Sequence, residues 1–378
     1  MDDSSTDSIP VTRPTLPDLA RVQATVAESY RAGMVTTGAV VELFEEEIHR
    51  FTGAKHAVAV SDCTSGLILA FAAHSFPTDA EVIVPSFTFA ATVQALIWNR
   101  LTPVYVDCLS GSMTMDPEEV LKAIGPKTAA IYPAAVFGLP PDYDALTEIS
   151  ERHGIPLLFD SAQGLGSTYK EHRAGTFGSC EVFSLSPTKV VTAIEGGLVT
   201  TNDSELAEKL RAMRDYGKGP DGEDMLYNGL SARMSELHAA VGLLSLQDAD
   251  SLIGSRHRLI GRYTEVASRF RGCRVQELPS DRTSTGNYFS LRIGPDALTD
   301  RDGVVQALAA HHMQSKRYYA IPVHMQTAFR DKRHRVVGDL ANTLAAARES
   351  LVLPLFSHMT DEQQDRVCSV LASVLAKA

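Results

Sequence analysis

The chain has 378 residues and a formal net charge of −11, and 44% of its residues are hydrophobic and 21% are charged. These values are ordinary for a globular protein with a sizeable core, and they exclude a mainly disordered chain, which combines low hydrophobicity with high net charge. The acidic balance argues against a general nucleic-acid or membrane-surface binder, because such proteins carry a basic stripe. The densest basic run, Lys332–Arg335, is short and is expected on a solvated loop.

The cysteines and the first residues predict a soluble protein of a reducing compartment. The five cysteines are odd in number, widely spaced and without a CxxC pair, so we expect neither a disulfide framework nor a zinc site. Residues 1–12 are expected to form a loose polar lead-in, without the apolar run of a signal peptide. No run approaches the roughly 20 apolar residues of a membrane span. We therefore expect a cytoplasmic protein with no metal site.

From about residue 50, short β-rich runs alternate with helical patterns. The predicted strands are His56–Val60, Glu81–Val84, Pro103–Asp107, Ala129–Pro133, Pro156–Asp160, Glu181–Ser184 and Leu198–Thr201. The predicted helices between them are Thr64–His74, Ala90–Asn99, Pro117–Ile124 and Tyr143–His153. Several of these strands are apolar without alternation, as expected when both faces of a sheet are covered. The alternation predicts an α/β fold with a mostly parallel sheet.

The pattern of predicted helices and strands changes near residue 250. Helical patterns cover Ser235–Leu252 and Arg256–Phe270, and an α+β pattern follows. That pattern consists of a strand at Tyr288–Ile293 and helices at Asp300–His311 and Asp361–Ala376. We therefore expect a large α/β domain over residues 1–250, with an N-terminal arm, and a smaller α+β domain over residues 251–378.

Three features stand where ligands bind in open parallel sheets, beyond the carboxyl ends of the strands. Asp160 ends an apolar strand and is suited either to cap the next helix or to contact a ligand. Lys189 lies in a loop of small, hydroxylic and apolar residues, where partial desolvation would make it a usable amine nucleophile. The Thr64-Ser65-Gly66 run opens a helix and is either an ordinary N-terminal cap or a phosphate cradle.

The three features together suit pyridoxal phosphate (PLP). A phosphate site would anchor this cofactor, a carboxylate would keep its pyridine nitrogen protonated, and a lysine would form a Schiff base with its aldehyde.

The chain resembles the DegT/DnrJ/StrS family of sugar aminotransferases, within the fold-type I PLP enzymes, from about Gly38 to the C-terminal helix. The motifs that carry the resemblance are Phe44-Glu45-x-Glu47, Ser61-x-x-Thr64, Val84-Pro85-Ser86-Phe87-Thr88-Phe89-x-Ala91-Thr92, Pro103-Val104-x-Val106-Asp107, Asp160-Ser161-Ala162-Gln163, Phe183-Ser184 with Lys189, Glu195-Gly196-Gly197, Arg233-Met234-x-Glu236, Pro322-x-His324 and Leu353-Pro354-Leu355. The resemblance implies a large domain with a seven-stranded, mostly parallel sheet.

The resemblance also implies roles for individual residues. Lys189 would hold PLP covalently and later carry the proton between the substrate and the cofactor. Asp160 would pair with the pyridinium nitrogen, and Gln163 would bond the 3-hydroxyl of the ring. Phe89 would stack on the ring, and a set of hydroxyl and amide groups would bind the phosphate: Thr64, the backbone N–H of Ser65, and Ser184.

Two positions depart from the pattern of the family. Cys63 stands where members often have glycine, and it would be strained if that turn needs a positive φ. Ser231, in Gly229-Leu230-Ser231-Ala232-Arg233, stands where an asparagine usually binds the phosphate of the second subunit. The resemblance implies a homodimer with shared active sites. Lys189 favours transamination, because a related branch with histidine at this position performs dehydration.

The leading hypothesis is a PLP-dependent aminotransferase that converts a keto group of a nucleotide-linked deoxysugar to an amine, with glutamate as donor, in amino-sugar or antibiotic biosynthesis. One alternative changes the acceptor to a keto-cyclitol or another small ketone. Another is a non-catalytic PLP-binding regulatory protein, which would not need Lys189, Asp160 and Gln163 together. Three residues are candidates for substrate binding or for packing: Tyr318, Tyr319 and His324.

Overall fold

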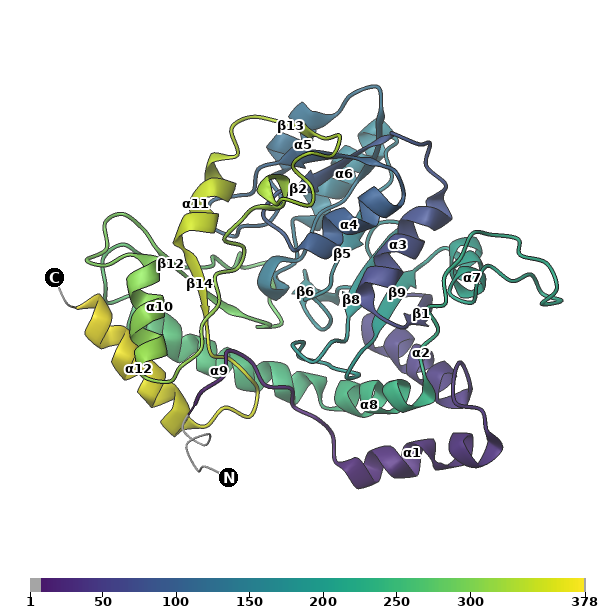
Figure 1. Cartoon of the computed structure of the whole chain (residues 1–378), viewed down its shortest axis with the longest axis horizontal. Coiled ribbons are helices and arrows are strands. Elements are labelled where there is room, and N and C mark those ends of the chain that lie inside the picture. Colours follow the sequence, from purple (N-terminus) through teal and green to yellow (C-terminus); the bar gives the residue numbers. More distant parts are fainter. Residues whose placement is uncertain (1–7, 377–378) are drawn as a thin grey trace.

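The computed structural model describes residues 8–376, which form an α/β structure built on one extended sheet (Figure 1). The strands of this sheet are β1 (His56–Val60), β2 (Glu81–Pro85), β3 (Thr102–Val106), β4 (Thr128–Ile131), β5 (Leu158–Asp160), β8 (Cys180–Ser184), β9 (Gly197–Thr201) and the short β13 (Arg335–Val336). Two four-stranded sheets are ordered β1-β9-β8-β5 and β13-β3-β2-β4. Parallel bridges, Ile131 to Leu157 and Ala134 to Asp160, join them.

The direction of the strands confirms the predicted mostly parallel sheet. Strand β9 is antiparallel to both β1 and β8, whereas the pairs β5–β8, β2–β4, β2–β3 and β3–β13 are parallel. Leaving aside β13, the central strands are the seven predicted from the sequence. The carboxyl ends of the parallel strands therefore meet at one edge of the sheet.

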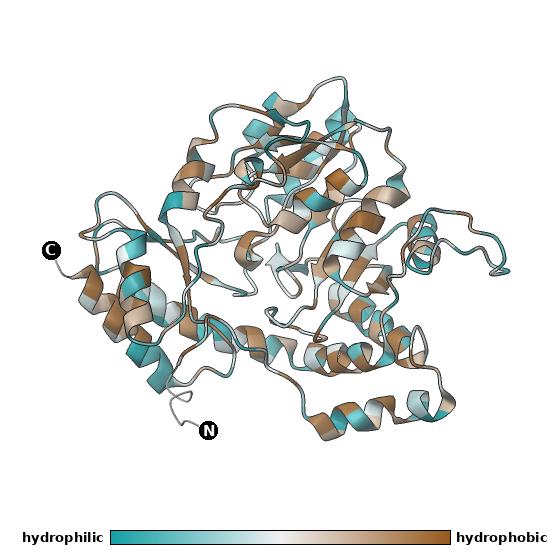
Figure 2. Cartoon of the chain, viewed as in Figure 1, coloured by the Kyte–Doolittle hydropathy of each residue, from teal (hydrophilic) through white to brown (hydrophobic). Residues whose placement is uncertain are grey.

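Helices cover both faces of the sheet, which explains why its strands are apolar without alternation. On one face, α3 (Cys63–His74), α4 (Ala90–Trp98) and α7 (Ser204–Met213) bury residues such as Val58 and Val82. On the other face, α5 (Pro117–Ala123) and α6 (Tyr143–His153) cover Ile83 and Phe159. The helices α1 (Leu19–Ala32), α2 (Ala39–Thr52) and α8 (Glu236–Gln247) extend that second layer. Figure 2 shows α3 and α4 largely in brown, as befits helices packed inside the molecule.

Several elements differ from the predictions. The sequence reasoning missed α1, α2, α7, α11 (Ala341–Glu349), β10 (Cys273–Val275) and β14 (Ser350–Leu353). The buried residues of α2 include Val40, Phe44 and Ile48, at the four-residue spacing of one helix face. The predicted helix Ser235–Leu252 is interrupted at Asp248, so that α8 ends at Gln247 and α9 (Ala249–Ala267) begins at Ala249.

The C-terminal part has its own antiparallel sheet, ordered β10-β12-β14, with β12 at Phe289–Ile293. Three helices share its core: α9, α10 (Arg301–Ala310) and α12 (Asp361–Leu375). Ile9 joins this core and forms backbone hydrogen bonds with His312 and Gln314, so residues 8–12 are not a loose lead-in. Residues 1–7 of that predicted lead-in lie outside the described residues.

The C-terminal part also contacts the large sheet. Strand β13 pairs with β3, and Val323, Phe329 and Leu340 pack in the core under α3 and α4. The two-residue strand β11 (Arg282–Thr283) pairs with β6 (Thr168–Tyr169). These contacts cross the predicted boundary at residue 250, and the division into two domains stays a prediction.

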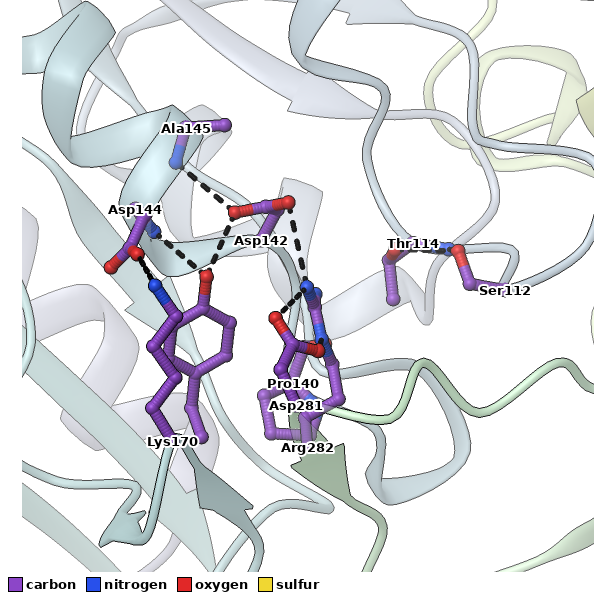
Figure 3. A network of polar contacts seen from close by, with 10 residues as sticks. Ser112, Thr114, Pro140, Asp142, Asp144, Ala145, Lys170, Asp281 and Arg282 are labelled. Carbon is purple, nitrogen blue, oxygen red and sulfur yellow. Dashed lines mark hydrogen bonds and ion pairs between the residues drawn. The ribbon is translucent and has the colours of Figure 1, made fainter.

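A polar network supports the β11–β6 junction (Figure 3). The Arg282 side chain, only 7% exposed, bonds Asp281 at 2.8 Å and Asp142 at 3.4 Å. Its guanidinium lies 4.8 Å from the centre of the Tyr169 ring, whose hydroxyl donates to Asp142 at 3.0 Å. The network therefore fastens a C-terminal segment to the start of α6.

Among residues 8–376, no helix is both long and apolar enough to cross a membrane.

Candidate active site

A cavity of about 320 Å³ opens at the carboxyl edge of the large sheet. Its walls come from the segments that follow β1, β2, β4, β5 and β8, from the segment before β9, and from three tyrosines of the C-terminal part. The lining residues that carry polar or aromatic groups include Asp62, Thr64, Thr88, Phe89, Asp160, Gln163, Ser184, Ser186, Thr188, Lys189, Glu195, Tyr288, Tyr318 and Tyr319. This is where ligands bind in open α/β sheets, and it brings most of the predicted site residues together.

Asp160 lies at the base of the cavity. Its side chain is 6% exposed and accepts hydrogen bonds from the Thr92 hydroxyl at 2.6 Å and the Ala162 backbone N–H at 3.1 Å. Burial raises the pKa of the Asp160 carboxyl, while these two donors and the nearby Lys189 ammonium act in the opposite direction. A buried carboxylate of this kind is poised to pair with a cation that enters the cavity.

Gln163 and Tyr319 form a second polar group in the wall. The Gln163 Nε2 donates to the Tyr319 hydroxyl at 3.1 Å, whereas its Oε1 is buried and has no hydrogen-bond partner among the described residues. A buried acceptor without a donor costs free energy, so this oxygen is suited to a donor on a ligand. Burial also raises the pKa of the Tyr319 hydroxyl, which keeps it protonated.

Lys189 follows β8 and shares the cavity with Ser184 and Phe89. Its side chain is half-buried, and its backbone N–H bonds the Ser186 carbonyl at 3.0 Å. The Phe89 ring at the start of α4 is 56% exposed, which is unusual for a large apolar group and leaves it open to a flat partner. The cavity thus combines an amine, a buried carboxylate and an exposed aromatic ring.

The amino end of α3 forms the side of the cavity near Thr64. Asp62 is the N-terminal cap of the helix, and its Oδ1 accepts from the Ser65 N–H at 2.8 Å. The Ser65 N–H, predicted to be a phosphate ligand, is therefore already bonded, and Ser65 lies just beyond the lining residues. Cys63 is the first residue of α3 and is not among the positive-φ residues, so the expected strain does not arise there.

Close packing explains the glycine at position 197 of the Glu195-Gly196-Gly197 motif. A Cβ atom added to Gly197 would stand 2.6 Å from the Asp62 carbonyl carbon and 2.7 Å from the Cys63 nitrogen. Only glycine allows β9 to start this close to the turn that opens α3. The motif therefore sets the distance between the Lys189 loop and the amino end of α3.

Three predicted site residues lie outside the cavity: Ser65, His324 and Ser231. The His324 Nδ1 is 2.5 Å from the Ser86 hydroxyl, and burial lowers the pKa of the imidazole. This contact ties the His324 segment to the loop after β2, and a role of His324 in substrate binding stays a prediction. Ser231 is exposed and bridges to Asp215, away from the cavity of its own chain.

The sequence reasoning missed three polar groups that shape the cavity: Asp62, Tyr288 and Thr92. Tyr288 was predicted only as the first residue of a strand, and its ring lies 5.1 Å from that of Tyr318. Thr92 follows Phe89 by three positions on α4, a spacing that places both on one helix face. That spacing was the available signal for Thr92, whereas nothing in the sequence placed Tyr288 beside residues of the large sheet.

Comparison with known proteins identifies relatives over nearly the whole chain. A family model described as the DegT/DnrJ/EryC1/StrS aminotransferase family matches residues 18–372. GDP-perosamine synthase of Caulobacter vibrioides is 32% identical over 343 residues, which are 90% of this chain and 91% of that protein.

Solved structures agree with this result. The crystal structure of DesI with its TDP-sugar product is 32% identical, with a TM-score of 0.91 over 98% of this chain and 94% of that chain. DesV of S. venezuelae, solved in complex with a ketimine intermediate, is 31% identical, with a TM-score of 0.91 over 99% of this chain and 100% of that chain. These similarities confirm the predicted fold class and the predicted family resemblance.

Proposed function

Because the chain belongs to the DegT/DnrJ/EryC1/StrS aminotransferase family, we propose that it uses PLP to aminate the keto group of a nucleotide-linked deoxysugar, with glutamate as the amino donor. The observation that carries the proposal is the convergence of Lys189, Asp160 and the unpartnered Gln163 Oε1 on one cavity. These groups come from three distant segments of the chain. A packing role would not require all three to face the same space.

The residues present fit PLP at four points. Asp160 is a buried carboxylate that would pair with the protonated ring nitrogen, and the Gln163 Oε1 would accept from the 3-hydroxyl of the ring. Phe89 offers an exposed aromatic face. Thr64 and Ser184 supply hydroxyls for the phosphate at the amino end of α3. Among the described residues, no group of three or more His, Cys, Asp or Glu side chains is arranged to hold a metal ion.

When bound, PLP would supply an electron-withdrawing ring and a carbon that carries the amino group from donor to acceptor. The protein would contribute binding, orientation and proton transfer. Lys189 would hold the cofactor covalently at rest and, once displaced by the substrate amine, would move a proton to and from the reacting carbon. Asp160 would keep the ring nitrogen protonated through its buried negative charge.

The C-terminal tyrosines would meet the acceptor. Tyr288, Tyr318 and Tyr319 line the side of the cavity that faces the C-terminal part. The Lys316 Nζ lies 3.4 Å from the Tyr318 hydroxyl and would bring positive charge to the rim for a diphosphate group. Two relatives support a nucleotide-linked sugar, since one is a GDP-perosamine synthase and another was solved with a TDP-sugar product.

A neutral acceptor such as a keto-cyclitol is the second candidate. The specific observation in its favour is the charge of the cavity, whose described lining has Asp62, Asp160 and Glu195 but only Lys189 as a cation. This balance offers little attraction to a diphosphate inside the cavity itself. The two candidate acceptors therefore differ in whether the positive charge of Lys316 at the rim of the cavity contributes to their binding.

We also propose that two copies of the chain share their active sites. Exposed apolar side chains include Ile194, which precedes the cavity residue Glu195, and Met34 and Val35, which follow α1. Such a group of exposed apolar residues is typical of an interface. In this arrangement Ser231, which is exposed and does not line the cavity of its own chain, would contribute to that of the partner subunit.

A defined substrate panel tests the proposal. The purified protein would be incubated with PLP, ¹⁵N-labelled glutamate and either keto-sugar nucleotides or keto-cyclitols, and products would be identified by mass spectrometry. We expect a ¹⁵N-labelled amino sugar nucleotide. Amination of the cyclitols alone would support the second candidate, and label transfer from other amino acids but not glutamate would overturn the choice of donor.

A further inference from the structure

Asp62 is at once a wall of the cavity and the cap of α3. Its Oδ1 accepts from the Ser65 backbone N–H at 2.8 Å, and its Oδ2 accepts from the Ser65 hydroxyl at 2.7 Å and the Ser61 hydroxyl at 2.9 Å. The side chain is thus held in place by three hydrogen bonds. The chain places its own carboxylate at the positive end of a helix of 12 residues.

A phosphate group at the amino end of α3 would lie beside this carboxylate. The amino end of a helix attracts anions because its first N–H groups are free and its dipole is positive there. In this chain Asp62 already uses the Ser65 N–H and hydroxyl. A carboxylate and a phosphate beside one helix end also repel each other, and this repulsion is strong where water is partly excluded.

The other residues of the cavity do not compensate for this charge. Glu195 lines the same cavity and adds a second carboxylate on the side of the Lys189 loop. Lys189 is the only Lys or Arg in the described lining, and in the proposed function its nitrogen is bonded to the cofactor aldehyde and is not a free ammonium group beside the phosphate. The phosphate would therefore meet more negative charge than the helix end alone predicts.

We propose that Asp62 competes with the cofactor phosphate for the amino end of α3 and so weakens the hold of this chain on phosphate-bearing cofactors. The inference rests on the proposed function, and it identifies Asp62 as a residue that lowers cofactor affinity. The competition acts most strongly on pyridoxamine phosphate, because that form has no covalent link to Lys189 and relies on its non-covalent contacts. The chain is therefore expected to release the amine form of the cofactor readily.

The test compares Asp62→Asn with the matched control Asp203→Asn. Asparagine is as good a cap as aspartate, so Asp62→Asn removes the charge and retains an acceptor for the Ser65 N–H. Asp203 caps α7 in the same way, accepting from the Glu205 N–H at 2.9 Å, and it does not line the cavity. The dissociation constants of PLP, pyridoxamine phosphate and phosphate-free pyridoxal would be measured by absorbance and fluorescence titration of cofactor-free protein.

We expect Asp62→Asn to bind pyridoxamine phosphate about tenfold more tightly than the original chain, as loss of one close like-charge contact implies. The affinity of Asp62→Asn for PLP should also increase, and its affinity for pyridoxal should be unchanged. Asp203→Asn should have the same affinities as the original chain for all three compounds. Unchanged or weaker binding of both phosphate forms would overturn the inference, as would an equal gain for pyridoxal. Asp62→Ser, another good cap without charge, would replace Asp62→Asn if that variant failed to fold.

A separate outcome identifies failure of the proposed function. If the original chain showed no Lys189-dependent absorbance band with PLP, the proposed cofactor would be wrong. Binding of inorganic phosphate to the same variants by calorimetry would then still test Asp62, because the competition at α3 involves only the anion. Equal phosphate affinity of the original chain and Asp62→Asn would overturn the inference in that case also.

Discussion

The Thr92 hydroxyl donates a 2.6 Å hydrogen bond to the Oδ2 of Asp160, a carboxylate that is only 6% exposed. Burial raises the pKa of Asp160, and the Thr92 bond is the largest influence in the opposite direction. Thr92 therefore helps to keep Asp160 ionised inside a cavity with little water. In the proposed function, this charge is what keeps the cofactor ring protonated.

Thr92→Val should lower kcat by about tenfold, since a hydrogen bond to a charged group contributes about 1.5–3 kcal/mol. The absorbance band of the lysine-bound cofactor should also change its pH dependence, because the pKa of Asp160 rises when the donor is lost. Steady-state kinetics and a spectral pH titration check both effects. Thr78→Val, at an exposed threonine outside the cavity, is the control, and equal behaviour of the two variants would contradict the role of Thr92.

Lys189→Ala should bind PLP without the covalent link and should lose turnover by at least about 100-fold, because general acid–base catalysis alone contributes that much. The visible band of the lysine-bound cofactor should be absent, while equilibrium dialysis still detects bound PLP. Lys122→Ala, at an exposed lysine paired with Glu119, should behave like the original chain. Persistent transamination by Lys189→Ala would show that another residue carries the proton.

His74 makes the stability of the chain depend on pH. Its Nδ1 lies 2.7 Å from the Ala70 carbonyl oxygen and its Nε2 lies 2.6 Å from the Ser179 hydroxyl, and burial lowers the pKa of the imidazole. The folded state therefore binds a proton less readily than the unfolded state. The contribution of His74 to the free energy of unfolding is fully present above the ordinary histidine pKa of about 6.5. It is lost as the pH falls below that value.

His74→Gln should flatten this dependence, with the difference bounded by about 1.4 kcal/mol per pH unit for one group. Urea unfolding at pH 7.5 and at pH 5.5 measures it. The original chain should lose more free energy of unfolding between the two pH values than His74→Gln does. Identical losses would show that the buried imidazole does not titrate in this range.

Arg282→Lys tests the network of Figure 3. The guanidinium contacts Asp281, Asp142 and the Tyr169 ring together, a geometry that a lysine ammonium does not reproduce. We expect a loss of about 1–3 kcal/mol in the free energy of unfolding, measured by chemical denaturation. Arg258→Lys, at an exposed pair with Asp361, should cost less than about 1 kcal/mol. Equal costs for the two variants would contradict a structural role for Arg282.

Much of the large sheet followed from local pattern. Apolar runs such as Val82–Val84 occur where both faces are covered, and each of the seven strands predicted in this region was found. The interruption at Asp248 was not predictable, because the sequence on both sides continues a helical pattern. The amphipathic spacing of α2 was present in the sequence and was overlooked.

The part of the candidate site that lies at the ends of the parallel strands was predictable from the sequence. Asp160 ends one parallel strand and Lys189 follows another, so their meeting at one edge of the sheet follows from topology. The state of the Ser65 N–H was not predictable, since whether Asp62 bonds it depends on the rotamer of one side chain. The direction of the His324 ring was not predictable for a similar reason, because its motif does not determine whether the ring faces the cavity or Ser86.

Reductive trapping tests the central claim most directly. The PLP-loaded chain would be treated with borohydride, digested and analysed by peptide mass spectrometry. The account predicts a single pyridoxyl phosphate adduct on the peptide that contains Lys189, which is lost when glutamate is added before reduction. An adduct on another lysine, or no adduct at saturating PLP, would contradict the assignment of this cavity as the site of amino transfer.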